Sequence, residues 1–332
     1  MKQQKIVRVQ QSTMLFGLIG ICLLAWLLID EGFGTILTVF SLIDCNIIWV
    51  GVYRVLAILV DANGWRQLYP QENRPAFREF SLARWLAEAV NTLLPVAQLG
   101  GHYVRARFLG KKNRESVEAA ATVTVDFTIG LFTQVTFTCM GLALILIQTG
   151  YQDSTSMLLM GVLIAIFGVV GFFLSQKAGL FNRITAWFSF FPRLKVNSGL
   201  LENALSLDRR IREIYQCKSK LIPCFIWRLA GWIVKSGENW IILYLAGVSI
   251  TWQEALILES LCTAFRSAAF FVPAGLGVQD GGLLYVGLII GIDSTSLMAL
   301  ALAKRFRELM VGIPGILCWF ILDREADLKL QR

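Results

Sequence analysis

Several runs of about 20 apolar residues constrain this chain more than any other feature, because a helix needs roughly 20 such residues to cross about 30 Å of hydrocarbon. The chain of 332 residues is 56% hydrophobic and 16% charged, whereas soluble domains average about 45–50% and about 25%. We therefore predict an all-α polytopic membrane protein with about six full transmembrane helices. The qualifying runs are 14–29, 36–60, 119–148, 156–174, 221–247 and 297–322.

Several classes of site and partner are not expected. The seven cysteines are scattered without a C-x-x-C pair, and the single histidine is His102. This pattern favours neither a metal site nor a disulfide framework. The sequence also lacks a P-loop and a dinucleotide fingerprint, so we expect no nucleotide cofactor and no ATPase segment. The net charge of +8 comes from membrane-flanking residues and does not indicate nucleic acid.

The basic residues predict the topology, because Lys and Arg mark cytoplasmic loops. They gather in the N-terminal tail, in 66–84, in 105–114, in 176–220 and in the C-terminal tail. We expect these segments and both termini to face the cytoplasm. The remaining short connections carry no basic residue and are expected to face outward: 30–35, 149–154, 248–253 and 293–296.

Two apolar segments must return to the side from which they enter. Segment 85–104 lies between basic stretches, and segment 254–292 lies between two outward connections. Each contains a Pro/Gly break, at Pro95 and at Pro273. We predict two re-entrant hairpins of half-helices, because non-helical backbone at membrane depth is tolerated where protein or a water-filled cavity covers it.

The two hairpins enter from opposite sides, which predicts an inverted repeat within a single membrane domain, 1–332. The halves would be 36–150 and 221–322, joined by a cytoplasmic or interfacial connection, 176–220. Within that connection, residues 200–215 have helical spacing and are read as a surface-lying element.

Equivalent positions in the two halves of the proposed repeat carry opposite charges. Glu88 lies seven residues before Pro95, and Arg266 lies seven before Pro273. From these equal offsets we expect Glu88 and Arg266 to meet near the midplane as an ion pair.

Basic residues inside the apolar runs need partners, since a central charge costs about 2.5–3.5 kcal/mol on insertion scales. Arg54 and Arg228 lie near the predicted cytoplasmic boundary and are expected to snorkel. Lys304, Arg305 and Arg307 lie deeper in the last run, and Glu308 on the same helix is one partner. The other candidate partners are Glu88, Asp126, Glu238, Glu259 and Asp280.

Two interpretations of these charges stay open, a structural ion-pair network or a site for an anionic substrate group. The glycines of 277–282 also have two readings. They either allow close helix packing or leave backbone N–H groups free for an anion at a half-helix N-terminus.

Three motifs in order resemble the flippase-like family built on the lysylphosphatidylglycerol synthase transmembrane region. They are EAVNTLLPVAQLGG (88–101), LESLCTAFRSAAFFVPAGLGVQDGG (258–282) and LAKRFRELMVGIPG (302–315). The closest resemblance is to the hopanoid-biosynthesis-associated membrane proteins, the L member of that gene cluster. The resemblance implies a bacterial inner-membrane protein that handles amphiphilic lipids. Asp280, where relatives usually have glutamate, and His102, where an acid often stands, depart from the family pattern.

The resemblance and the residue pattern together give the candidate substrate-binding residues. No catalytic residue is assigned. The candidates are Glu88, Asn91, Pro95, Gly100, Gly101, Asp126, Glu259, Arg266, Pro273, Gly277, Gln279, Asp280, Gly281, Gly282, Lys304, Arg305, Arg307 and Glu308.

The leading function is a lipid translocase without enzymatic activity, driven downhill or by a coupled ion. The first alternative is a lipid-modifying transferase with an intramembrane site. The sequence ends ten residues after the last predicted run, so we expect the soluble aminoacyltransferase domain of the synthase relatives to be missing. The second alternative is a scaffold that recruits lipid-synthesis enzymes at the cytoplasmic face through 176–220.

Overall fold

The computed structural model describes residues 46–94, 100–113, 116–149, 163, 166–167, 169–180, 198–268 and 278–330. Within these ranges the regular elements are helices and there is no strand, so the predicted all-α class is confirmed for them. The main helices are α3 (Ile47–Arg66), α4 (Phe77–Leu93), α5 (Gly100–Asn113), α6 (Ser116–Thr149), α9 (Ser198–Gln216), α10 (Lys218–Leu245), α11 (Trp252–Ala268), α12 (Val278–Ile289) and α13 (Ser294–Leu330).

Local sequence signals explain where several of these helices begin and end. Leu94, which follows α4, is extended with φ −112° and ψ 142°, because the residue before a proline avoids the helical region. At the start of α11, the Thr251 hydroxyl accepts a hydrogen bond from the Glu254 N–H at 3.2 Å. The Glu254 carboxylate in turn accepts one from the Thr251 N–H at 2.6 Å, which completes a capping box. Gly247, at φ 81°, provides the left-handed residue that ends α10.

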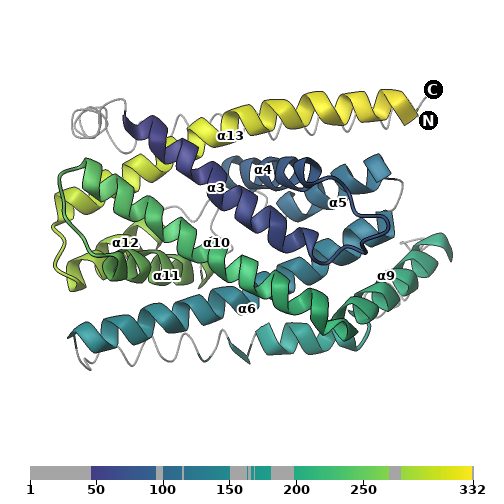
Figure 1. Cartoon of the computed structure of the whole chain (residues 1–332), viewed down its shortest axis with the longest axis horizontal. Coiled ribbons are helices and arrows are strands. Elements are labelled where there is room, and N and C mark those ends of the chain that lie inside the picture. The colour runs from purple at the N-terminus through teal and green to yellow at the C-terminus, as the bar shows by residue number, and fades with distance from the viewer. Residues whose placement is uncertain are drawn as a thin grey trace, which may run out of the picture.

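The helices pack in two corresponding sets, α3–α6 and α10–α13. Helix α4 packs on α5 and on α13, while α11 packs on α12 and on α6. Helix α3 contacts α13 as α10 contacts α6, and the two sets meet along α3 and α10. Figure 1 shows the α4–α5 pair and the α11–α12 pair toward opposite ends of the molecule. Each short pair therefore lies among long helices of both sets.

The predicted spans correspond in part to the helices. By length and composition, two described helices could cross a membrane, Ile47–Arg66 and Ser116–Gln148. Helices α10 and α13 contain most of 221–247 and all of 297–322, and their 28 and 37 residues exceed the roughly 20 that a span needs. Run 14–29, most of 156–174 and the tips of both predicted hairpins lie outside the described residues.

Charged residues form a layer between two apolar cores. Along α3, Val50 belongs to one core and Trp65 to the other, and Arg54 and Asp61 lie between them in the sequence. Along α10, Cys224 and Ile242 belong to the two cores in the opposite order. Arg228, Lys235 and Glu238 of α10 lie between these two positions. These charges, like Arg54 and Asp61, therefore lie in interior turns of their helices.

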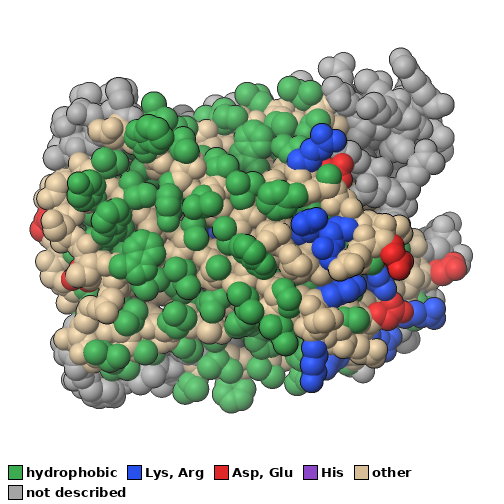
Figure 2. Space-filling view, viewed as in Figure 1, with side chains coloured by type: hydrophobic (Ala, Val, Ile, Leu, Met, Phe, Trp, Pro, Cys, Tyr) green, Lys and Arg blue, Asp and Glu red, His purple; other side chains and the backbone are tan. Residues whose placement is uncertain are grey.

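The outward faces of the helices are apolar. Ile48, Trp49 and Val52 on α3 and Ile222 and Ile226 on α10 are exposed. Figure 2 shows apolar side chains over most of the visible face, with Lys and Arg gathered at the end where α9 lies in Figure 1. A molecule with an apolar exterior and charged residues inside is suited to hydrocarbon surroundings.

Helix α9 confirms the helical reading of 200–215 and packs on α6. Its Ile211 and Ile214 are buried. Arg210 forms ion pairs with Glu118 at the start of α6 and with Glu213. The hydrogen bonds from Arg210 to Glu118 hold the pKa of this guanidinium above its ordinary value. Helix α9 is therefore fixed to the end of the helix bundle by packing and by charge.

Candidate charged cavity between the helix pairs

A cavity of about 500 Å³ lies between the two sets of helices. We call it the charged cavity, because its lining includes eight Lys or Arg side chains and five Asp or Glu side chains. The bases are Arg54, Arg84, Arg105, Arg228, Lys235, Arg266, Lys304 and Arg307, and the acids are Asp61, Glu88, Glu238, Glu259 and Glu308.

One group of charges is centred on Asp126 of α6, whose side chain is 0% exposed. Arg84 Nη2 of α4 donates to both Asp126 carboxylate oxygens at 2.6 Å, and Arg105 Nη1 of α5 donates to Oδ2 at 2.5 Å. Arg228 Nε of α10 lies 3.8 Å from Oδ1. Asp126 thus joins three arginines from three helices.

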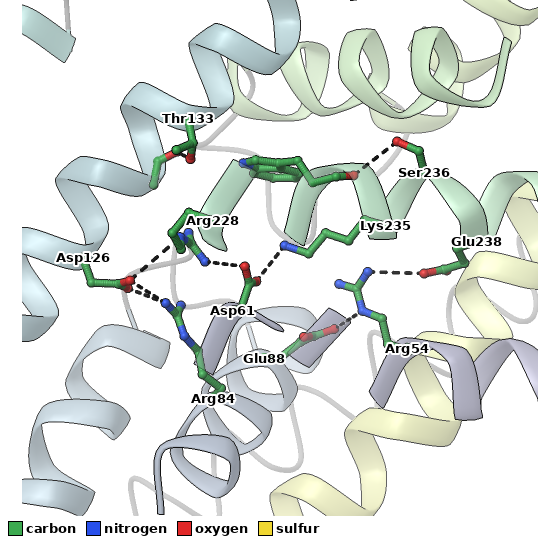
Figure 3. A network of polar contacts seen from close by, with 12 residues as sticks. Arg54, Asp61, Arg84, Glu88, Asp126, Thr133, Arg228, Lys235, Ser236 and Glu238 are labelled. Carbon is green, nitrogen blue, oxygen red and sulfur yellow. Dashed lines mark hydrogen bonds and ion pairs between the residues drawn. The ribbon is translucent and has the colours of Figure 1, made fainter. Parts of the chain in front are cut away.

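Asp61 of α3 extends this group toward α10. Arg228 Nη1 lies 3.0 Å from Asp61 Oδ1, and Lys235 Nζ donates to Asp61 Oδ2 at 2.8 Å. Figure 3 shows the contacts of Asp126 with Arg84 and Arg228 and those of Asp61 with Arg228 and Lys235. The set is named the Asp126 cluster and comprises Asp61, Arg84, Arg105, Asp126, Arg228 and Lys235.

A second group, the Glu238 cluster, comprises Arg54, Glu88, Glu238 and Arg307. Arg54 Nε donates to Glu88 Oε1 at 2.6 Å, and its Nη1 donates to Glu238 Oε2 at 3.3 Å. Arg307 Nε donates to Glu238 Oε1 at 2.7 Å. These contacts join α3, α4, α10 and α13 within a part of the cavity distinct from the Asp126 cluster.

Lys304 and Arg305 of α13 have partners on α11 and α12. Lys304 Nζ donates to Glu259 Oε2 at 2.8 Å. Arg305 donates to Asp280 at 2.9 Å and to Glu308 at 3.2 Å. Each of the three bases in the predicted last span is therefore in an ion pair.

Arg266 of α11 differs from the other bases of the cavity in its lack of an ion pair with any described residue. Among the described residues it makes no ion pair within 4 Å, and its buried Nε has no hydrogen-bond partner. Gln279 of α12 also lines the charged cavity, and its buried Oε1 has no partner in the described part of the chain. The α11–α12 pair thus brings two unsatisfied polar groups to the cavity.

The structure places the sequence-predicted site residues in three groups. Those that line the charged cavity are Glu88, Asn91, Gly101, Glu259, Arg266, Gln279, Lys304, Arg307 and Glu308. Asp126 and Arg305 form ion pairs with lining residues, Asp280 forms an ion pair with Arg305, and Gly282 lies against Phe265. Gly100 and Gly281 are described but are not part of the lining, while Pro95, Pro273 and Gly277 lie outside the described residues.

The expected ion pair between Glu88 and Arg266 is wrong. Glu88 binds Arg54 and lies 3.9 Å from Arg307, so α3 and α13 supply its partners. The equal offsets from the two prolines fix positions along each helix but not the direction in which a side chain points. Lys304 pairs with Glu259, one of the other candidate partners, and Glu308 is confirmed as a same-helix partner for Arg305 but not for Lys304.

The snorkelling of Arg54 and Arg228 and the loop positions of Arg84 and Arg105 are also wrong. All four line the charged cavity. Helix α4 begins at Phe77 and α5 continues to Asn113, so Arg84 and Arg105 lie in helices and not in cytoplasmic loops. For Arg54 and Arg228, the sequence does contain a signal of an interior position. Arg54 and Asp61, and likewise Arg228 and Lys235, are seven residues apart and share one helix face.

Gly101 allows close contact within the α4–α5 pair. Its N–H donates to Asn91 Oδ1 at 2.7 Å, and a Cβ at this position would lie 2.5 Å from the Ala87 carbonyl oxygen. The absence of a side chain therefore lets the start of α5 lie against α4 beside the break at Pro95.

Replacing Gly101 with alanine is expected to lower the free energy of unfolding by about 1–3 kcal/mol, because the added methyl group would force the two helices apart. The measurement is urea unfolding in detergent micelles. Gly281→Ala is the matched control, because a Cβ there meets nothing within 4 Å. Equal stabilities for the two variants would contradict the close contact at Gly101.

The sequence matches the family described as the lysylphosphatidylglycerol synthase TM region over residues 14–315. Comparison with curated proteins and comparison with solved structures give no match. The family match covers both helix sets and the charged cavity, and it indicates a membrane domain with a lipid-related function. The chain belongs to the lysylphosphatidylglycerol synthase TM region family.

Proposed function

We propose that this protein is a membrane lipid translocase, which moves an amphiphilic lipid with an anionic or hopanoid-type head between leaflets. The observation that carries the proposal is the charged cavity, which lies between two short helix pairs inside an otherwise apolar bundle. Intramembrane charges commonly mark substrate pathways. The polar head would occupy the cavity while the lipid tail stays in the hydrocarbon.

The corresponding helix sets support an inverted repeat as the basis of alternating access. We propose halves 36–150 and 221–322, joined by the 176–220 connection within one membrane domain. Matching contacts of α4 and α11 with the long helices of the other set favour this assignment. In transporters with inverted repeats, substrate sites lie near the midplane at the repeat interface. The α4–α5 and α11–α12 pairs would be the two re-entrant hairpins.

The charge distribution supports an orientation with both termini in the cytoplasm of a bacterial inner membrane. Exposed Arg209, Arg212 and Lys218 lie at the α9 end, and basic residues favour the cytoplasmic side. The connections 246–251 and 290–293 contain no Lys or Arg.

Single cysteines at Arg209 and at Asp293 are therefore expected to react with a membrane-impermeant maleimide from opposite sides, the first from the cytoplasm. Both positions are exposed, so labelling is not limited by burial. The native cysteines are replaced beforehand. Labelling of both positions from the same side would contradict the orientation.

Reconstitution in vesicles tests the function. A labelled lipid is expected to change leaflet faster in vesicles that contain the protein than in protein-free vesicles, with its mass unchanged. A change of lipid mass would favour the lipid-modifying transferase, and neither change would favour a scaffold for lipid-synthesis enzymes. Arg307→Gln is expected to abolish movement, while Arg209→Gln on the exposed face of α9 serves as the matched control. Transport by folded Arg307→Gln at the normal rate would contradict a role for the charged cavity.

A further inference from the structure

The charges of the cavity are unevenly distributed between its two parts. In the Asp126 cluster, the four bases Arg84, Arg105, Arg228 and Lys235 have only two acids within ion-pair distance among the described residues. Outside it, the five bases Arg54, Arg266, Lys304, Arg305 and Arg307 are equal in number to the five acids Glu88, Glu238, Glu259, Asp280 and Glu308, with Arg266 outside ion-pair distance of any of them. Among these described residues, the surplus of two positive charges therefore lies in the Asp126 cluster.

Aromatic rings lie against three of the four bases of the Asp126 cluster. The guanidinium of Arg105 lies 5.0 Å and that of Arg84 lies 5.7 Å from the ring centroid of Trp65. Lys235 Nζ lies 4.2 Å from the ring centroid of Trp232. Cations over aromatic faces are attracted by the ring quadrupole, so the bases are positioned before a ligand binds.

Hydrogen-bond donors in the same cluster remain without acceptors. Within the described residues, the buried Nε atoms of Arg84 and Arg228 have no hydrogen-bond partner. Gly130 of α6 leaves room for the Arg228 guanidinium, because a Cβ there would lie 2.5 Å from Nη2. Arg84, Arg228 and Lys235 all line the cavity. An oxyanion would supply both the missing negative charge and the missing acceptors.

We infer that Arg84, Arg105, Arg228 and Lys235 form a subsite for a phosphate-class oxyanion. The inference rests on the proposed translocase, for which it names the substrate class: a lipid whose head carries a phosphate group. Guanidinium groups bind phosphate oxygens in pairs, and two surplus positive charges match the charge of one phosphate monoester. The three paired bases of α13 are not part of this subsite.

Single variants can test the subsite without leaving a carboxylate unpaired. In Arg84→Gln, Asp126 keeps Arg105 as its partner, and in Lys235→Gln, Asp61 keeps Arg228. Both variants are therefore expected to fold, which thermal unfolding in detergent verifies. Arg209→Gln, an exposed arginine of α9, is the matched control.

The experiment measures equilibrium binding to the purified protein by tryptophan fluorescence, with short-chain phosphatidate, short-chain diacylglycerol and inorganic phosphate as probes. Phosphatidate is expected to bind about tenfold or more tightly than diacylglycerol, because charged hydrogen bonds are lost without the phosphate. Arg84→Gln and Lys235→Gln should each weaken phosphatidate binding by about tenfold. Arg209→Gln should not change it, and inorganic phosphate should compete.

The outcomes separate this inference from the proposed function. Equal binding of phosphatidate and diacylglycerol, or normal phosphatidate binding by both folded variants, would overturn the subsite. Lipid movement between leaflets that is insensitive to both variants would overturn it too and would leave the translocase standing. If inorganic phosphate binds in a manner that depends on Arg84 and Lys235 while phosphatidate does not bind, the oxyanion subsite is supported with free phosphate as its ligand. That outcome would contradict lipid translocation.

Discussion

Replacing Asp126 with asparagine is expected to lower the free energy of unfolding by about 3–5 kcal/mol, the usual effect of removing one partner from a buried ion pair. The Asp126 carboxylate is fully buried and accepts hydrogen bonds from Arg84 and Arg105. Asparagine retains the shape but not the charge. The four bases of the Asp126 cluster would then have Asp61 as their single described acid.

Urea unfolding of the purified protein in detergent micelles measures this effect. Glu72→Gln is the matched control, because Glu72 is an exposed acid in the connection before α4 and surface charges contribute about 0–1 kcal/mol. If the two variants unfold at the same urea concentration, Asp126 does not hold the arginines together.

The second large effect is expected for Glu238 and Arg307. Glu238→Gln removes the closest partner of Arg307 and weakens the contacts of Arg54, and Arg307→Gln removes the closest partner of Glu238. Each single variant is expected to lower the free energy of unfolding by about 3 kcal/mol. The double variant should lose less than the sum, because no unpaired partner remains.

A double-mutant cycle measures this coupling, which is expected to lie between about 0.5 and 3 kcal/mol. The cycle that combines Glu238→Gln with Arg209→Gln is the control, and its two effects should add because the residues lie in separate parts of the molecule. Additive losses for Glu238 and Arg307 would mean that their 2.7 Å contact carries no coupling energy.

The sequence predicts the helical class and the break after α4 well, because these depend on local chemistry. The break after α4 follows from Pro95 and the residue before it. The helical reading of 200–215 follows from the spacing of apolar residues such as Ile211 and Ile214, which are buried in α9. Neither feature requires knowledge of contacts between distant segments.

The pairing of charges could not be predicted in the same way. Arg307 and Glu238 are 69 residues apart, and Lys235 and Asp61 are 174 apart, so no local pattern joins them. Counting Lys and Arg as loop markers failed for Arg84 and Arg105, because the count does not distinguish a base beside a loop from one inside a helix. The seven-residue spacing of Arg54 and Asp61 does indicate a shared face, but it does not name the partner helix.

The contact between α3 and α10 also has a consequence for biosynthesis. Asp61 on α3 reaches its partner Lys235 only after a further 174 residues have been added to the chain, whereas Arg54 meets Glu88 after 34. Until α10 is added, Asp61 would lack its ion-pair partners in hydrocarbon, at about 2.5–3.5 kcal/mol on insertion scales. We therefore expect the nascent chain to stay in a shielded location, beside the translocon or a membrane chaperone, until α10 arrives. A ribosome stalled before α10 would leave Asp61 unpaired and make the incomplete chain a substrate for membrane proteases.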